Sequence, residues 1–418
     1  MVATGIGKTP ANSATLPFYG AGAVFFLALS ILMFIAADRF RDHFFNPETL
    51  ALVHSAALGW GTMIIFGAAY QLLPVIFERE LFSSRIAFVS FWFLFIGTIV
   101  LIASFWYFEI GIPMISGGVL ILIAVVLYSL NVFMTGRSAN FSIQKLYIMS
   151  SAIWLLITVI IGVLLAINLY RPYIPYNHLE ILKLHAHIGF VGWFLQLITG
   201  VSSKLVPMFL FGKSEKEKLL YAAFVFQNLG LIGFVCDHFF LGGSGRVYIY
   251  LALVTMGIVF WFGYLRDVYI KRVKKKIDVQ MQFTFISIVS LLIVLILVTA
   301  VLIFSGNQWS VLYGIFIFLG WISAIIFGKT FKTLPFVIWN MHYKDVHGKN
   351  NIPLPRDLFN DKLLVFQFWF FISALLALTV GVLFNQLVII KLGLFLWIIV
   401  ALLYVLNVAN VFLHKKLI

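Results

Sequence analysis

The sequence predicts an all-α integral membrane protein that crosses the bilayer twelve times. Three observations lead to this fold class: an apolar composition, twelve long apolar segments and a motif that occurs three times. Of the 418 residues, 62% are hydrophobic and 11% are charged, whereas soluble proteins average about 45–50% apolar and about 25% charged residues. With a mean hydropathy of +1.06, the chain is expected to be a multi-pass protein of the cell (inner) membrane, with the lipid bilayer as its main partner.

Each predicted span is an apolar run of at least about 20 residues, the length that an α-helix needs to cross a bilayer. The longest runs are expected to tilt. The twelve runs lie near residues 16–37, 48–77, 84–107, 112–134, 144–169, 179–211, 218–240, 246–270, 280–304, 308–340, 360–385 and 388–413.

The distribution of lysine and arginine predicts the orientation of the spans, because cytoplasmic loops carry an excess of both. The two termini and the loops after spans 2, 4, 6, 8 and 10 hold 20 of the 29 basic residues, and the opposite loops hold 6. Both termini are therefore expected in the cytoplasm. The basic run 271–276 serves either as a topology signal or as a contact for acidic lipid. The net charge of +14 thus follows from topology, and no nucleic-acid partner is expected.

The single cysteine, Cys236, excludes an internal disulfide and a cysteine-based zinc or iron–sulfur site. The N-terminal segment has no apolar core before Leu16, so no cleaved signal peptide is expected.

A threefold motif predicts internal repetition. It consists of Gly-Trp, six residues, a glycine, six further residues and a proline. Counted from five residues before each Gly-Trp pair, the copies occupy residues 54–74, 187–207 and 315–335, on spans 2, 6 and 10. They run in the same direction and lie four spans apart, so a single twelve-span domain over residues 1–418, made of three pseudo-threefold four-helix units, is expected. Helix packing and kinks are the alternative role of these glycines and prolines.

Two histidines occupy the same position in this repeat. His54 and His187 each lie five residues before the first glycine of a copy, where the third copy has Ile315. His185 precedes His187 by two residues and therefore points about 200° away from it on a helix. All three histidines lie roughly 9–12 Å into their spans.

Ionisable residues inside a membrane are costly and usually functional, and a neutral imidazole is a good ligand for haem iron or copper. The pattern therefore predicts a haem or metal site that uses His54, His185 and His187. Interhelical hydrogen bonds and a proton relay are the alternatives. His238 ends span 7 and is a fourth candidate metal ligand, although it also fits an interfacial loop residue.

Other polar residues within spans leave alternatives open. Lys204, Lys329 and Lys332 lie in the inner halves of spans 6 and 10, where they either line a proton route or extend toward the membrane surface. Trp60 and Trp193 either pack on a porphyrin or belong to the packing of the repeat.

Twelve spans, cytoplasmic termini, three four-helix units and outer histidines on spans 2 and 6 together resemble the haem–copper oxidase subunit I superfamily. That superfamily includes oxygen reductases and nitric-oxide reductases. The resemblance covers nearly the whole chain in architecture. It implies haem, expected to be b-type, with His54 as a ligand of the low-spin haem. It also leaves copper open, with His185 or His187 and a partial match at His238 as its ligands. The chain is similar in outline to the NnrS-type haem proteins, which are associated with nitric-oxide stress.

The sequence departs from this family on span 10, where the family carries a His-x-His motif and this chain has Ile315. The motif lies on span 6 instead, so a complete dioxygen-reducing site is not expected. The resemblance implies a divergent member with one haem or a rearranged pair of sites. We therefore expect a haem-dependent redox protein, leaning toward an oxidoreductase, that binds or reduces nitric oxide or oxygen. His54 and His187 are the preferred axial ligands, and His185 is the second-site or alternative one. A transporter or channel for metal ions or protons is the alternative function.

Overall fold

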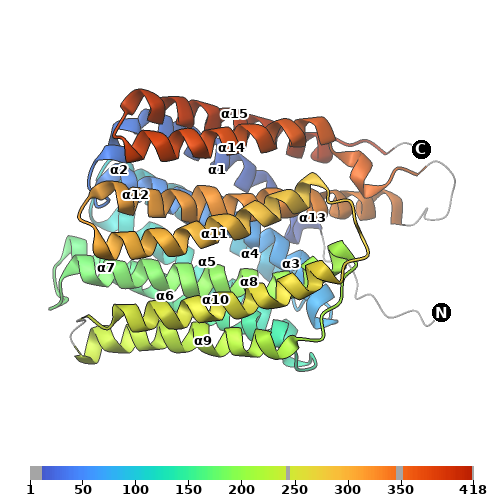
Figure 1. Ribbon diagram of the computed structural model, residues 1–418, viewed down its shortest axis with the longest axis horizontal. Coiled ribbons are helices and arrows are strands. Elements are labelled where there is room, and N and C mark those ends of the chain that lie inside the picture. The colour runs from blue at the N-terminus through green and yellow to red at the C-terminus, as the bar shows by residue number, and fades with distance from the viewer. Residues whose placement is uncertain (1–11, 242–244, 345–351, 417–418) are drawn as a thin grey trace. The chain divides into compact units, whose positions relative to one another are not determined.

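The computed structural model describes residues 12–241, 245–344 and 352–416, and most of these residues lie in long helices (Figure 1). In these ranges, twelve segments are long and apolar enough to cross a membrane. They are Asn12–Ile35, Pro47–Phe77, Ser84–Trp106, Ile112–Arg137, Ile143–Tyr170, His178–Leu210, Lys218–Phe240, Val247–Ile270, Val279–Ile303, Asn307–Tyr343, Asp361–Leu383 and Leu387–Phe412. Each lies within a few residues of a predicted run, so the prediction of an all-α, twelve-span protein is confirmed.

Three of these spans are interrupted, which is why twelve spans contain fifteen α-helices. The helices are α1 (Leu16–Ile35), α2 (Pro47–His54), α3 (Met63–Phe77), α4 (Ser84–Trp106), α5 (Ile112–Arg137), α6 (Ile143–Tyr170), α7 (His178–His187), α8 (Gln196–Leu210), α9 (Glu217–Cys236), α10 (Val247–Ile270), α11 (Val279–Ile303), α12 (Asn307–Ile315), α13 (Ser323–Tyr343), α14 (Asp361–Leu383) and α15 (Leu387–Phe412). The interrupted spans are the second, sixth and tenth, which carry the repeated motif.

The described residues form two compact units. The first contains residues 71–93 and 110–276, and the second contains residues 12–70, 94–109 and 277–416. In the first unit α5 packs along α6, α9 packs along α10, and α8 contacts both α6 and α10 (Figure 1). In the second unit α14 packs along α15, α15 also contacts α1, and α11 packs along α13.

An aromatic cluster forms the centre of the second unit. The Trp60 ring is fully buried and stacks on Phe26, with 4.3 Å between ring centroids. Tyr404 meets Trp60 edge-on at 5.1 Å, and the Trp60 Nε1 donates a hydrogen bond of 2.9 Å to Ser323 Oγ. In the first unit Trp193 is buried edge-on against Tyr128, 5.7 Å away. Both tryptophans therefore serve helix packing.

The outward faces of the helices are apolar. Val24 on α1, Leu229 on α9 and Trp369 on α14 all have more than half of their surface exposed. Large apolar side chains are costly to leave in water, but they match the hydrocarbon of a bilayer. The exposed surface thus agrees with a protein that spans a membrane.

Candidate functional site: the histidines of the repeated spans

The same local structure marks all three copies of the repeat. A π-helical segment begins directly after the position held by His54, His187 and Ile315. The three segments are Ser55–Thr62, Ile188–Leu195 and Phe316–Ile322. A π-helix is rare and is found frequently at functional sites. The two histidines therefore lie at the boundary between an α-helical turn and a wider turn.

The glycines of the repeat bring the preceding span close. A Cβ at Gly59 would lie 2.8 Å from the ring of Phe25 on α1, and a Cβ at Gly192 would lie 2.6 Å from Trp154 on α6. In the third copy, a Cβ at Gly320 would lie 3.1 Å from Ser290 on α11. Small residues allow such close approach between membrane helices. The packing role that the sequence left open for these glycines is thus present in each copy.

Asparagine caps fix where the two histidine-bearing helices begin. The Asn46 side chain accepts a hydrogen bond of 2.8 Å from the Thr49 backbone N–H at the start of α2. The Asn177 side chain accepts one of 2.9 Å from the Leu179 N–H at the start of α7. Such caps satisfy backbone donors that have no partner within the helix. By fixing where each helix begins, the caps also fix the helical positions of His54 and His187 at its far end.

The segment before α2 is held by charged side chains. Arg39 donates hydrogen bonds to Asp42 (3.1 Å) and Glu48 (2.8 Å). These two carboxylates raise the pKa of the Arg39 guanidinium above its ordinary value. Because Glu48 lies in the first turn of α2, this arginine ties the preceding segment to the helix that carries His54.

His54 and His187 have the same hydrogen-bond geometry. The Nδ1 of His54 lies 2.7 Å from the backbone carbonyl oxygen of Leu50, and the Nδ1 of His187 lies 2.7 Å from that of Lys183. A carbonyl oxygen can only accept a hydrogen bond, so Nδ1 carries the proton. In the neutral ring the lone pair is then on Nε2, and each imidazole has a fixed tautomer and direction.

Aromatic rings from other spans contact both imidazoles. His54 stacks on Phe105 of α4, with 4.7 Å between ring centroids and 23° between ring planes. His187 meets Phe234 of α9 edge-on at 5.7 Å. His54 belongs to the second unit and His187 to the first.

His185 lies against a neighbouring helix. Its Nδ1 donates a hydrogen bond of 2.9 Å to the carbonyl oxygen of Thr158 on α6. A Cβ at Gly162, one turn further along α6, would lie 2.9 Å from the His185 Cε1. His185 therefore faces α6 while His187 faces α9, which agrees with the angle predicted from the helix. Thr158 and Gly162 were not predicted from the sequence, because a backbone carbonyl and a small residue have no distinguishing pattern there.

His238 follows α9 in the π-helical turn Asp237–Leu241. Its ring lies 6.2 Å from that of Tyr176. Its Nε2 is buried and has no hydrogen-bond partner among the described residues. The preceding Asp237 pairs with Arg246 at 2.8 Å. The described ranges contain no group of three or more histidine, cysteine, aspartate or glutamate side chains arranged to hold a metal ion.

The third copy lacks a ligating side chain at the matching position, because Ile315 is an aliphatic residue with 4% of its surface exposed. Lysines further along this span pair with the preceding helix. Lys329 Nζ donates to Thr284 Oγ1 at 3.0 Å, and Lys332 Nζ lies 2.6 Å from the carboxylate of Asp278, the cap of α11. Lys332 thus contacts the residue that caps the start of α11.

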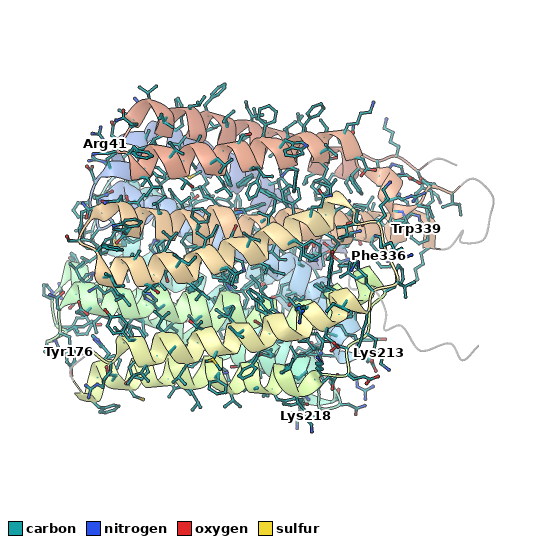
Figure 2. The ribbon with its side chains drawn as sticks, viewed as in Figure 1. Arg41, Tyr176, Lys213, Lys218, Phe336 and Trp339 are labelled. Carbon is teal, nitrogen blue, oxygen red and sulfur yellow. The ribbon has the colours of Figure 1, made fainter. Side chains whose placement is uncertain are left out.

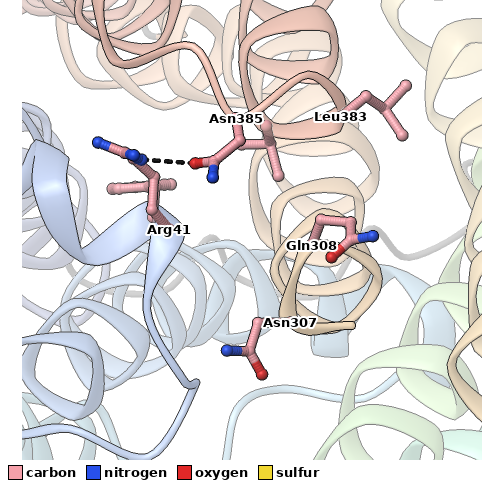
Figure 3. A pocket seen from close by; sticks show the side chains of 7 residues that line it. Arg41, Asn307, Gln308, Leu383 and Asn385 are labelled. Atoms are coloured by element: carbon pink, nitrogen blue, oxygen red, sulfur yellow. Dashed lines mark hydrogen bonds between the residues drawn. The ribbon is translucent and has the colours of Figure 1, made fainter. Parts of the chain in front are cut away.

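A separate pocket of about 320 Å³ lies within the second unit (Figure 3). Its lining comes from Phe40, Arg41, Asn307, Gln308, Val382, Leu383 and Asn385. Arg41 Nε donates a hydrogen bond to Asn385 Oδ1 across it. None of the predicted histidine ligands lines this pocket.

Comparison with known proteins identifies relatives over part of the chain. No protein-family model matches the sequence. The chain is 36% identical over 93 residues to the cbb3-type cytochrome c oxidase subunit CcoN1 of Stutzerimonas stutzeri, which is 22% of this chain and 19% of that protein. It is 42% identical over 76 residues to a cytochrome c oxidase subunit 1 homolog of Agrobacterium tumefaciens (strain T37), which is 18% of this chain and 14% of that protein.

A third relative also matches only a short part of the chain. Cytochrome c oxidase subunit 1 of Rhodobacter capsulatus is 36% identical over 76 residues, which again is 18% of this chain and 14% of the relative. The matches thus span less than a fifth of the length of each curated relative. Over these stretches the chain is similar to subunit I of cytochrome c oxidases, which supports the resemblance to the haem–copper oxidase subunit I superfamily.

Proposed function

We propose that this chain is a haem-binding redox protein of the membrane, with His54 and His187 as axial ligands of the iron. The observation that carries the proposal is the matched geometry of these two imidazoles. Both occupy the same repeat position, both precede a π-helical segment, and both donate from Nδ1 to a carbonyl four residues earlier at 2.7 Å.

The donor set fits a haem. A metal-binding histidine usually donates its other ring N–H to a carbonyl or carboxylate, which fixes the tautomer and makes the ligating nitrogen more basic. His54 and His187 each have such a bond, and their lone pairs lie on Nε2. Phe105 and Phe234 contact the two rings and place apolar surface beside them, as a porphyrin edge requires.

A bound haem would supply an iron that changes between the ferrous and ferric states, and a diatomic gas would bind that iron only where one of the two imidazoles leaves a position open. The chain would supply the axial nitrogens, hold their direction through the Leu50 and Lys183 carbonyls and keep the surroundings apolar. Nitric oxide or oxygen is the proposed gas, and the haem is proposed to be b-type.

We assign His185 as the ligand of a second site or as the alternative axial ligand, with copper as the candidate metal. His238 is the further candidate donor, because its buried Nε2 has no described partner. The aliphatic Ile315 in the third copy supports a divergent protein with one haem or a rearranged pair of sites. Three four-helix units in one domain and cytoplasmic termini remain part of this proposal.

Optical spectroscopy tests the proposal. The purified protein, reduced with dithionite, should show sharp α and Soret bands and contain iron. His54→Ala and His187→Ala should each disturb the low-spin bands, whereas His342→Ala, at the end of α13, should leave them unchanged. Carbon monoxide should then reveal whether an open iron position exists.

Two results would count against it. A colourless preparation without iron would reject haem binding and favour a transporter or channel that uses the same histidines as relays. A coloured protein whose bands are unchanged in both alanine variants would reject the ligand assignment.

A further inference from the structure

Two basic linkers of the first unit are held together at one end of the helices. One linker joins α8 to α9, and the other follows α10. The Val273 N–H donates to the Phe211 carbonyl, and the Lys274 N–H donates to the Leu210 carbonyl, both at 3.3 Å. We call residues 211–218 and 267–276 the linker platform. Figure 2 labels Lys213 and Lys218 where α8 ends and α9 begins.

A buried carboxylate fixes the platform. Asp267 accepts a hydrogen bond of 2.7 Å from Ser214 Oγ. Its oxygens also lie 3.5 Å from Lys216 Nζ and 3.2 Å from Lys271 Nζ. The charge of Asp267 is therefore used within the platform, and the two linkers are joined by side chains as well as by backbone.

Four further lysines of the linker platform are exposed, and they outnumber the exposed acidic residues beside them. Lys213, Lys218, Lys275 and Lys276 are exposed and form no ion pair among the described residues. The two exposed acidic residues beside them are Glu215 and Glu217, so positive charge dominates. Clusters of four to eight basic residues beside a membrane helix attract anionic lipid headgroups.

Apolar side chains accompany this charge. Val273 is 77% exposed, Phe211 is 69% exposed and Ile270 is 61% exposed. Arg272, which precedes Val273 in the sequence, rests on the ring of Tyr269, with 3.8 Å from its guanidinium carbon to the ring centroid. A soluble polyanion offers nothing to such apolar groups, whereas a phospholipid offers both an anionic phosphate and acyl chains.

We propose that the linker platform binds the headgroup of an anionic phospholipid, with Lys213, Lys275 and Lys276 at the phosphate and Val273 and Phe211 at the upper acyl chain. A topology signal alone requires only the charges. It does not require the backbone pairing of the linkers or the clamp around Asp267. The proposal is independent of haem binding.

Native mass spectrometry of the full chain in neutral detergent tests this directly, and the detergent removes any effect of membrane orientation. The wild type should retain phosphatidylglycerol in preference to phosphatidylcholine. Lys213→Gln/Lys275→Gln/Lys276→Gln should weaken that preference by about fivefold per lysine and roughly a hundredfold in all. The matched control, Lys362→Gln/Lys415→Gln/Lys416→Gln, removes three exposed lysines elsewhere and should retain it.

Two further variants separate binding from folding. Replacing the same platform lysines with arginine should restore the preference, and Val273→Ser should weaken lipid retention without a change in charge. An unchanged preference in the platform glutamine variant, or an equal loss in the control, would overturn the proposal. Displacement of phosphatidylglycerol by inorganic phosphate at the same concentration of negative charge would also overturn the proposal, because the site would then bind phosphate rather than lipid.

Discussion

The second glycine of the third repeat provides a sharp test of the helix packing. A Cβ at Gly328 on α13 would lie 2.5 Å from the backbone oxygen of Gln280 and 3.2 Å from Thr284 Oγ1 on α11. The closest obstacle is a backbone atom beside the start of α11, so it cannot rotate away as a side chain can. We therefore expect Gly328→Ala to push α13 away from α11.

The size of the effect follows from this distance. Weak carbon–oxygen contacts lie at about 3.3 Å, so the new methyl group is about 0.8 Å too close. Overpacking a well-packed interior costs about 1–3 kcal/mol, and the fixed backbone obstacle places this site near the upper end. Alanine regains about 1 kcal/mol of helix propensity over glycine. The expected net loss is about 2 kcal/mol of unfolding free energy.

Gly314 on α12 is the matched control in the same span. No heavy atom lies within 4 Å of a Cβ at that position, so Gly314→Ala should be neutral or stabilise by up to about 1 kcal/mol. Both variants can be compared by titrating the protein in mixed micelles with dodecyl sulfate and following helix content by circular dichroism. If Gly328→Ala is as stable as Gly314→Ala, the contact between α11 and α13 is not as described.

Three other changes test other parts of the structure by the same titration. Trp60→Phe removes the hydrogen bond to Ser323 and part of a fully buried ring, so it should cost at least about 1 kcal/mol. Ser323 Oγ also donates to the Phe318 carbonyl, so Ser323→Ala should cost less in the Trp60→Phe background than alone, and fully additive losses would contradict the pairing. Asp278→Asn keeps the helix cap but removes the charge that faces Lys332. It should cost about 1–2 kcal/mol after allowance for partial exposure, and an equal cost in a Lys332→Gln background would argue against the ion pair. Burial, with His342 nearby, holds the pKa of His414 below its ordinary value. The unfolded chain therefore binds this proton more readily, so the stability involved is complete above pH about 6.5 and is lost as the pH falls toward the lowered pKa. His414→Gln should lose less stability than the wild type as the pH falls from about 8 to about 5, a range that includes the ordinary histidine pKa of about 6.5, and a steeper loss in the variant would refute the assignment.

The twelve spans could be predicted because hydropathy is a local property of the chain. The predicted run 246–270 and the observed α10, Val247–Ile270, differ by one residue. A bilayer requires a minimum apolar length, and that length can be read without knowledge of any contact. The repeat could be found for the same reason, since its glycines and prolines recur at fixed spacing.

The π-helical segments were not predicted. The sequence indicated close packing at Gly59, Gly192 and Gly320, and those contacts are present. A wider helical turn depends on where the neighbouring span pushes the backbone, which no residue type in Ser55–Thr62 specifies. Likewise, the depth of His54 and His187 could be estimated, but their shared bond to a carbonyl four residues earlier depends on the rotamer of each ring.

His185 shows where sequence reasoning ends. Helical periodicity placed it opposite His187, and it does contact α6 rather than α9. The identity of its partner could not be predicted, because Thr158 contributes only its backbone carbonyl. Trp60 illustrates the same limit, since its indole fits either a porphyrin or an aromatic core until Phe26 and Tyr404 are located beside it.

In the proposed site, one nitrogen from His54 and one from His187 ligate a haem iron. Pulsed electron paramagnetic resonance of the ferric protein, prepared with ¹⁵N-labelled histidine, measures this most directly. We predict two histidine nitrogens coupled to a low-spin iron, with one coupling lost in His54→Ala and one in His187→Ala. A haem iron whose histidine couplings are unchanged in both variants, or a protein without iron, would rule out ligation by His54 and His187.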